Sequence, residues 1–100
     1  MPYIKEYARK ELDECLDNMV QCLTHGNNLS DNEFITILGE INYSFSRIIA
    51  QSMGEISYSK IAMITGVLEN IKQEFYRRMA SPYEDKKIIA NGDIREYKKA

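Results

Sequence analysis

The spacing of the apolar residues is the feature that most constrains the fold of this chain. They recur every three or four positions over three long segments, residues 5–23, 30–53 and 57–80. Such spacing places them on one side of an α-helix. No pair of alternating segments flanks a tight turn, as a β-hairpin would require. The pattern therefore predicts an all-α protein, a small three-to-four-helix bundle that forms a single domain over residues 1–100.

Residues with capping preferences mark the ends of these helices. Gly26, in the stretch HGNN, is expected to take the left-handed conformation that ends the first helix. Ser30 and Glu33 have the spacing of a capping box and begin the second helix. Ser57 can cap the third. Gly39, inside the second segment, predicts a bend or a close helix crossing.

Pro82 is expected to separate the third helix from a short C-terminal helix. The residue before a proline is disfavoured in the helical region, so the third helix should end near Ala80. Proline suits the first turn of a helix, which predicts a new helix over residues 83–90. We expect Ile88 and Ile89 to dock this helix inward. The following "NGD" fits a left-handed C-cap, and a last helical turn could start at residue 93.

The charge of the chain is unevenly distributed. The net charge is −2, but residues 1–50 hold four basic and eight acidic side chains, whereas residues 51–100 hold nine basic and seven acidic ones. The overall balance argues against binding of duplex nucleic acid, which needs a basic surface. The C-terminal half would attract a small anion. No apolar run is long enough for a membrane span and no signal peptide is evident, so we expect a cytoplasmic protein.

The two cysteines are expected to be reduced core thiols. Cys15 and Cys22 lie seven residues apart, on the same helical face as Met19. His25 follows Cys22 by three residues and could complete a zinc site, but no fourth ligand is evident. We therefore expect neither a metal nor another cofactor.

Enzymatic signatures are largely absent from the sequence. The single histidine has no acidic residue at a matching helical offset, and there is no glycine-rich phosphate loop, no zinc-protease motif and no nucleophile elbow. We therefore expect a protein that is not an enzyme.

The second helix has more apolar positions than one packed stripe requires. This excess predicts a stable homo-oligomer with an interface formed partly by that helix. The residues concerned are Phe34, Ile35, Ile37, Ile41, Phe45, Ile48 and Ile49.

Three stretches of the chain resemble a family of short proteins from bacteriophages and bacteria. They are MPYI at the start, INYSFSRII at 41–49 and ITGVLENIKQEFYRRMASPYEDKKIIANGD at 64–93. The last stretch is the most specific, with its aromatic-Y-R-R, P-Y-E and N-G-D elements. The resemblance implies a phage-type accessory protein, which would act in the cytoplasm of the host.

The cationic, aromatic and amide residues of these stretches are the candidate ligand-binding residues. Arginine matches phosphate oxygens, tyrosine offers a flat face to a base, and the turn at 91–93 offers backbone N–H donors and a carboxylate. Alternatively, these charges only stabilise the helix through pairs such as Glu74 with Arg78. The candidates are Tyr43, Arg47, Lys72, Tyr76, Arg77, Arg78, Tyr83, Lys87, Asn91, Gly92 and Asp93.

Two functions fit this sequence. In the first, the protein binds and sequesters a nucleotide-derived host immune signal, of the cyclic or ADP-ribose type, with Arg77 held unpaired for the ligand. In the second, it is a helical protein-interaction module or inhibitor of a host protein, and the C-terminal block forms the oligomer or partner interface, because Arg and Tyr also dominate protein interfaces.

Overall fold

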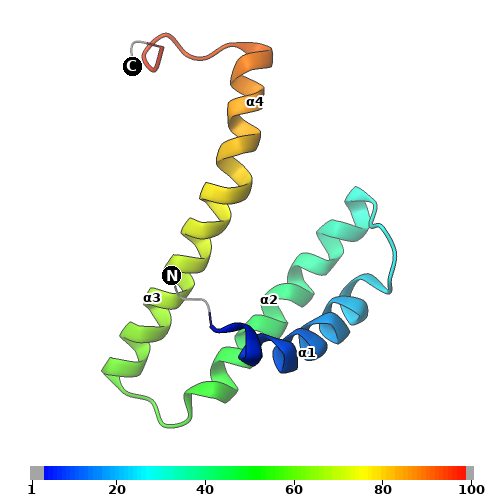
Figure 1. Cartoon of the computed structure of the whole chain (residues 1–100), viewed down its shortest axis with the longest axis vertical. Helices are drawn as coiled ribbons and strands as arrows, with labels where there is room; N and C mark the ends of the chain where they lie inside the picture. The colour runs from blue at the N-terminus through cyan, green and yellow to red at the C-terminus, as the bar shows by residue number, and fades with distance from the viewer. Residues whose placement is uncertain (1–3, 99–100) are drawn as a thin grey trace. The chain divides into compact units, whose positions relative to one another are not determined.

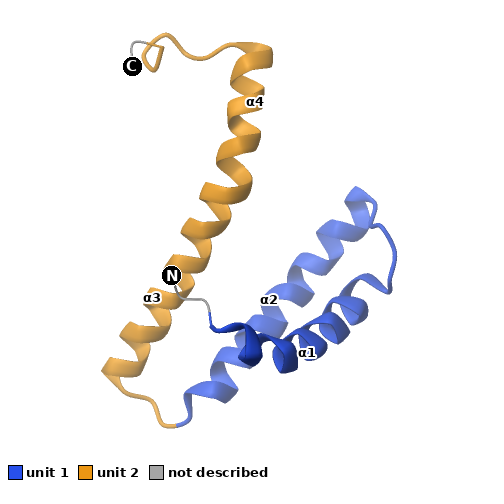
Figure 2. Ribbon diagram, viewed as in Figure 1, with its two compact units in different colours: residues 1–54 blue, residues 55–100 orange. Residues whose placement is uncertain are grey.

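The structure, a computed structural model, describes residues 4–98. The chain divides into two compact units, residues 1–54 and residues 55–100 (Figure 2). Both units are helical, and no strand occurs within the described residues (Figure 1). The predicted all-α class is therefore confirmed.

The first unit contains α1 (Glu6–Thr24) and α2 (Asp31–Met53), which contact each other. The backbone N–H of His25 bonds to the carbonyl of Gln21, and His25 itself is left-handed, with φ of 54°. Gly26 is left-handed as well, with φ of 74°. The cap thus begins one residue before the predicted glycine.

The predicted capping box begins α2. Ser30 Oγ accepts a hydrogen bond from the backbone N–H of Glu33 at 3.3 Å, and the Glu33 carboxylate accepts one from the backbone N–H of Ser30 at 3.1 Å. The bond from the Ser30 backbone is the main cause that lowers the pKa of Glu33. The helix ends at Met53, as predicted. A Cβ added to Gly39 would meet no atom within 4 Å apart from its chain neighbours and the backbone of its own helix, so the expected close helix crossing is absent from the described residues.

The second unit is a continuous helical stretch made of α3 (Tyr58–Phe75), a π-helical turn η1 (Tyr76–Ala80) and α4 (Ser81–Asn91). Ser57 caps α3 as predicted, because its Oγ accepts a hydrogen bond from the backbone N–H of Lys60 at 3.2 Å.

The expected departure from helical geometry before Pro82 is wrong. Ser81 has helical angles, φ −62° and ψ −48°, and its N–H bonds to the carbonyl of Tyr76, five residues earlier. A proline inside a regular α-helix removes one hydrogen bond, and its ring collides with the carbonyl four residues back. The wider π turn offers a different set of carbonyl positions and accommodates Pro82 in the first turn of α4. After α4, residues 95–98 form a hydrogen-bonded turn, in which the N–H of residue 98 donates to the carbonyl of residue 94 at 3.2 Å, as in a single helical turn.

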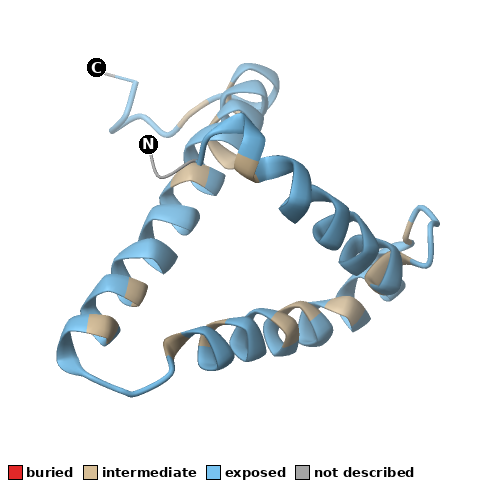
Figure 3. Ribbon diagram, turned by 60° about the horizontal axis from the view of Figure 1, so that its bottom comes forward, coloured by how far each residue is buried: buried red, intermediate tan, exposed pale blue. Residues whose placement is uncertain are grey.

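No side chain among residues 4–98 is buried (Figure 3). The apolar stripe of α3 is exposed, at 45% for Leu68, 56% for Ile71 and 63% for Phe75. Ile88 is half-buried, but Ile89 is 86% exposed, so the predicted inward docking is wrong for Ile89. An apolar helix face needs a second packed layer before it can be buried. Within the described residues, neither unit has a second layer that covers all of its apolar helix faces.

The prediction of core thiols is also wrong in this structure. Cys15 and Cys22 are both exposed. Among residues 4–98, no three His, Cys, Asp or Glu side chains come together as a metal site would require. No helix in the same range is long and apolar enough to cross a membrane.

Candidate functional site

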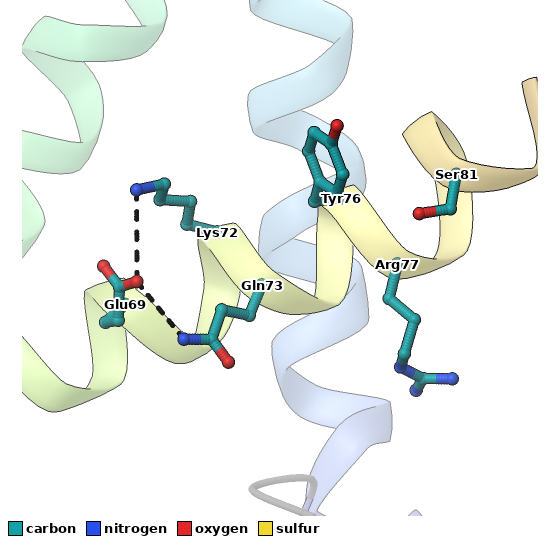
Figure 4. A pocket seen from close by; sticks show the side chains of 6 residues that line it. All are labelled: Glu69, Lys72, Gln73, Tyr76, Arg77 and Ser81. Carbon is teal, nitrogen blue, oxygen red and sulfur yellow. Dashed lines mark hydrogen bonds and ion pairs between the residues drawn. The ribbon is translucent and has the colours of Figure 1, made fainter. Parts of the chain in front are cut away.

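A shallow, open depression of about 370 Å³ lies along the end of α3, the π turn and the start of α4. Its volume is near the lower end of the range for small-molecule sites, about 300–1,000 Å³. Three of the predicted ligand-binding residues line it, Lys72, Tyr76 and Arg77. The other lining residues are Glu69, Gln73 and Ser81 (Figure 4).

Local helical spacing gathers these side chains. Glu69 lies three residues before Lys72 and four before Gln73, so all three share one side of α3. Glu69 Oε1 accepts a hydrogen bond from Gln73 Nε2 at 3.2 Å and lies 3.9 Å from Lys72 Nζ. Lys72 remains 78% exposed, so this long ion pair leaves the ammonium accessible to another anion.

Arg77 and Arg78 share a single carboxylate, that of Glu74. Arg78 Nε lies 2.7 Å from Glu74 Oε2, which confirms the predicted pair. Arg77 Nη2 lies 3.2 Å from Oε1 and 3.3 Å from Oε2, so the expectation of an unpaired Arg77 is wrong. Position 77 is three residues from Glu74, which is also within reach along a helix. Two guanidinium groups on one carboxylate leave one net positive charge at the π turn.

The orientation of the side chains divides the depression. Lys72 and Tyr76 project on one side of the helix, whereas the guanidinium of Arg77 extends away from them (Figure 4). The Arg77 guanidinium pairs with Glu74. The Tyr76 hydroxyl donates to Glu84 Oε2 at 3.3 Å, a contact that joins η1 to α4. Lys72, Tyr76 and Arg77 therefore line one depression, but the guanidinium of Arg77 extends away from the other two side chains.

The remaining predicted residues of the second unit make local contacts. Lys87 Nζ lies 5.5 Å above the ring of Tyr83. Asn91 is the last residue of α4, and the N–H of Gly92 donates to the carbonyl of Ile88 at 2.8 Å. Asp93 Oδ1 accepts from the N–H of residue 94 at 2.8 Å. The turn at 91–93 thus uses the N–H of Gly92 to cap α4, and this donor is not available to a ligand as the sequence had suggested.

Tyr43 and Arg47 lie in the first unit, where they line a second depression. The Arg47 guanidinium carbon lies 5.9 Å above the Tyr43 ring, an arrangement typical of a cation–π pair. Both residues line an open depression of about 380 Å³ on α2, with one contribution from α1. The other lining residues are Met19, Ser44, Ile48, Gln51 and Ser52.

Several lining residues were not among the predicted candidates. Glu69 and Gln73 share a side of the helix with Lys72 and Tyr76, as their spacing in the sequence predicts. Ser52 and Gln51 lie on the turn after Arg47 and follow the same rule. Helical spacing could not indicate Ser81 as a lining residue, because its position depends on the π turn.

Comparison with known proteins gives one family. Residues 1–94 match the family described as "Domain of unknown function (DUF6899)". No curated protein and no solved structure matches the chain.

Proposed function

The chain belongs to the DUF6899 family, and we propose that it is a non-catalytic, phage-type accessory protein that binds and sequesters a phosphorylated nucleotide. One observation carries this proposal: Lys72, Tyr76 and Arg77 line the same depression. An ammonium and a guanidinium favour phosphate oxygens, and a phenol ring offers a stacking surface for a base.

The ion pairs at the π turn support a role for Arg77 in this binding. Its contacts to Glu74, at 3.2 and 3.3 Å, are longer than the 2.7 Å contact of Arg78, and its side chain is 65% exposed. An exposed ion pair contributes little to stability. A phosphate entering the depression can therefore draw Arg77 away, while Arg78 keeps Glu74 neutralised.

The ligand that suits these groups is a cyclic or ADP-ribose-type nucleotide, such as those that act as host immune signals. Sequestration requires tight binding and no turnover, so the protein would need no catalytic group. It would act in the cytoplasm, where such signals occur. In an assembly of several copies, a neighbouring copy would make the depression more enclosed. Desolvation of that kind strengthens charge-assisted contacts.

Thermal melting with a panel of cyclic and ADP-ribose-type nucleotides tests the proposal. A ligand present at 100 times its dissociation constant adds about 2.7 kcal/mol to the free energy of unfolding. We expect one class of nucleotide to raise the melting temperature of the wild type. Arg77→Ala should lose most of this shift. Lys86→Ala is the matched control, since it also removes one exposed cation but lies outside both depressions. If no nucleotide shifts the wild-type melt, the proposal fails.

A protein-interaction module remains the second candidate, supported by the exposed apolar side chains. Phe34, Phe45 and Phe75 are 51%, 56% and 63% exposed, although such residues normally lie inside a protein or an interface. In that case the C-terminal block would contact a second copy or a host protein. The nucleotide panel separates the two candidates, because an interaction module would show no nucleotide-dependent shift.

A further inference from the structure

We propose that α3 is a dimerisation helix that pairs in antiparallel orientation with α3 of a second copy of this chain. This inference does not depend on nucleotide binding. It rests on the spacing of the apolar residues of α3 and on the charges beside them.

Five apolar residues of α3 form a single coiled-coil seam. They are spaced alternately three and four residues apart, which is the spacing of the a and d positions of a heptad. The seam consists of Ile61, Ile64, Leu68, Ile71 and Phe75. Ile64 is half-buried, and the other four side chains are 45–63% exposed. A seam of this length is left without a partner in the described residues of the second unit.

The charges beside the seam select the orientation of the pair. One flank carries Lys60, Val67 and Glu74, at the g positions, and the other carries Thr65 and Lys72, at the e positions. In a parallel pair each g residue faces the e residue five positions on in the other copy. Lys60 would then face a threonine, and Val67 would face a lysine, so no opposite charges would meet.

In an antiparallel pair, g residues face g residues. Lys60 of each copy then faces Glu74 of the other, so an opposite-charge pair forms at both ends of the interface, and Val67 faces its own copy at the centre. Glu74 also keeps its contacts with Arg77 and Arg78, and these three cations surround a single carboxylate.

This register also brings apolar residues of the two seams together. Ile61 meets Ile71 of the other copy, and Ile64 meets Leu68, each contact occurring twice. The overlap extends over the whole of α3, Tyr58–Phe75. Such a two-fold contact is closed, because the same surface is used by both copies. The self-complementarity of shape and charge is the reason to name a second copy as the occupant of this face.

Crosslinking of single cysteines tests the orientation. In a chain with Cys15 and Cys22 replaced by serine, we introduce either Val67→Cys or Ile61→Cys and add a short bifunctional maleimide. In the proposed dimer, residue 67 lies beside its own copy, whereas the two copies of residue 61 are about 15 Å apart along the axis, from a rise of 1.5 Å per residue. We expect crosslinked dimers with Val67→Cys only. Crosslinking with Ile61→Cys only would indicate a parallel pair and would overturn the orientation.

Light scattering without added nucleotide tests the interface itself. We expect the wild type to have at least twice the chain mass of 11.6 kDa. Leu68→Lys, on the seam, should lower the mass, whereas Met63→Lys should not. Met63 is a matched control, since it is a 63% exposed apolar residue of α3 outside the seam. Equal masses for the two variants, or a wild-type monomer that gives no crosslink, would overturn the proposal while leaving the nucleotide test unaffected.

Discussion

Glu74 is the residue on which the electrostatics of the π turn depend. Its carboxylate accepts a hydrogen bond from Arg77 and forms ion pairs with both Arg77 and Arg78. The Glu74 side chain is only 22% exposed. The hydrogen bond from Arg77 is the main cause that lowers the pKa of Glu74 below its ordinary value of 4.5. A lowered pKa in the folded state means that the ionised form stabilises the fold.

The pH dependence of this contribution follows from its sign. It is present above about 4.5, the ordinary value, and is lost as the pH falls through the folded-state pKa. We expect Glu74→Gln to lower the melting temperature at neutral pH, and we expect the difference from wild type to shrink in acid. Thermal melts of wild type and variant at several pH values measure this difference in melting temperature. Glu55→Gln, in the loop before α3, is the control. A difference that stays constant into acid would contradict the assignment.

Arg77 and Arg78 should respond differently to removal. Arg78→Ala should change the free energy of unfolding by a few tenths of a kcal/mol, as is usual for exposed ion pairs. Arg77→Ala should have a similar effect on stability but weaken nucleotide binding by roughly 2–4 kcal/mol, because a charge-assisted contact is lost. Titration calorimetry with the nucleotide found in the panel checks this. Equal losses of binding for both variants would show that only total charge matters.

The cysteines are now expected to be dispensable for stability. Because Cys15 and Cys22 are exposed on α1, replacement of either by alanine should change the free energy of unfolding by less than about 0.5 kcal/mol. Both thiols should also react with a soluble thiol reagent under native conditions. Slow labelling with a large loss of stability would place them in an interface of the assembled protein.

At the scale of the helices, Gly39 and Gly66 test whether the helix faces are open. Apart from the backbone of its own helix and its chain neighbours, neither has an atom within 4 Å of an added Cβ in the described residues, and both lie inside helices. Glycine in a helix interior costs about 0.5–1 kcal/mol relative to alanine, so Gly39→Ala and Gly66→Ala should each stabilise the protein by that amount. Chemical denaturation measures it. Destabilisation by Gly39→Ala alone would mean that another copy crosses α2 closely at this residue.

The helix boundaries were largely predictable from sequence because they depend on local contacts. Ser30 with Glu33, Ser57 and the end of α2 at Met53 each involve residues within a few positions of one another. The continuity through Pro82 was not predictable by the same reasoning. The usual preference before proline concerns a regular α-helix, whereas here the backbone changes its hydrogen-bond pattern over η1 (Tyr76–Ala80).

The candidate site was predictable in part, for the same reason. Lys72 and Tyr76 are four residues apart on one helix, so their common side could be read from the spacing. The contact between Arg77 and Glu74 could not be predicted from the spacing, because Glu74 is within reach of both position 77 and position 78 along the helix. The backbone N–H of Gly92 was expected to be available to a ligand, but it donates to the carbonyl of Ile88 at the end of α4.

For the whole molecule, the absence of buried side chains in residues 4–98 is the dominant fact. Isolated helices of this length are marginal in water, and most helical stability in proteins comes from packing of an apolar face. Chains of this size often gain the missing core by oligomerisation. On α2, Ile37, Ile41 and Ile49 are half-buried, whereas other apolar side chains of the same helix are exposed, namely Phe34, Ile35, Leu38, Phe45 and Ile48. Four of these exposed residues, Phe34, Ile35, Phe45 and Ile48, are among the seven from which the oligomer is expected, whereas Ile37, Ile41 and Ile49 of that set are half-buried.

We therefore expect a homo-oligomer in which α2 contributes an interface in addition to that of α3. Light scattering at micromolar concentration should give a mass above 11.6 kDa, and the melting temperature should rise with protein concentration, since assembly binds only the folded state. Phe45→Glu places a charge on the exposed apolar side of α2 and should lower both the mass and the melting temperature. Ala50→Glu is the control, because it adds the same charge at an exposed position on the opposite side of that helix. A wild-type monomer whose melting temperature is independent of concentration would show that the chain covers its apolar faces without a second copy.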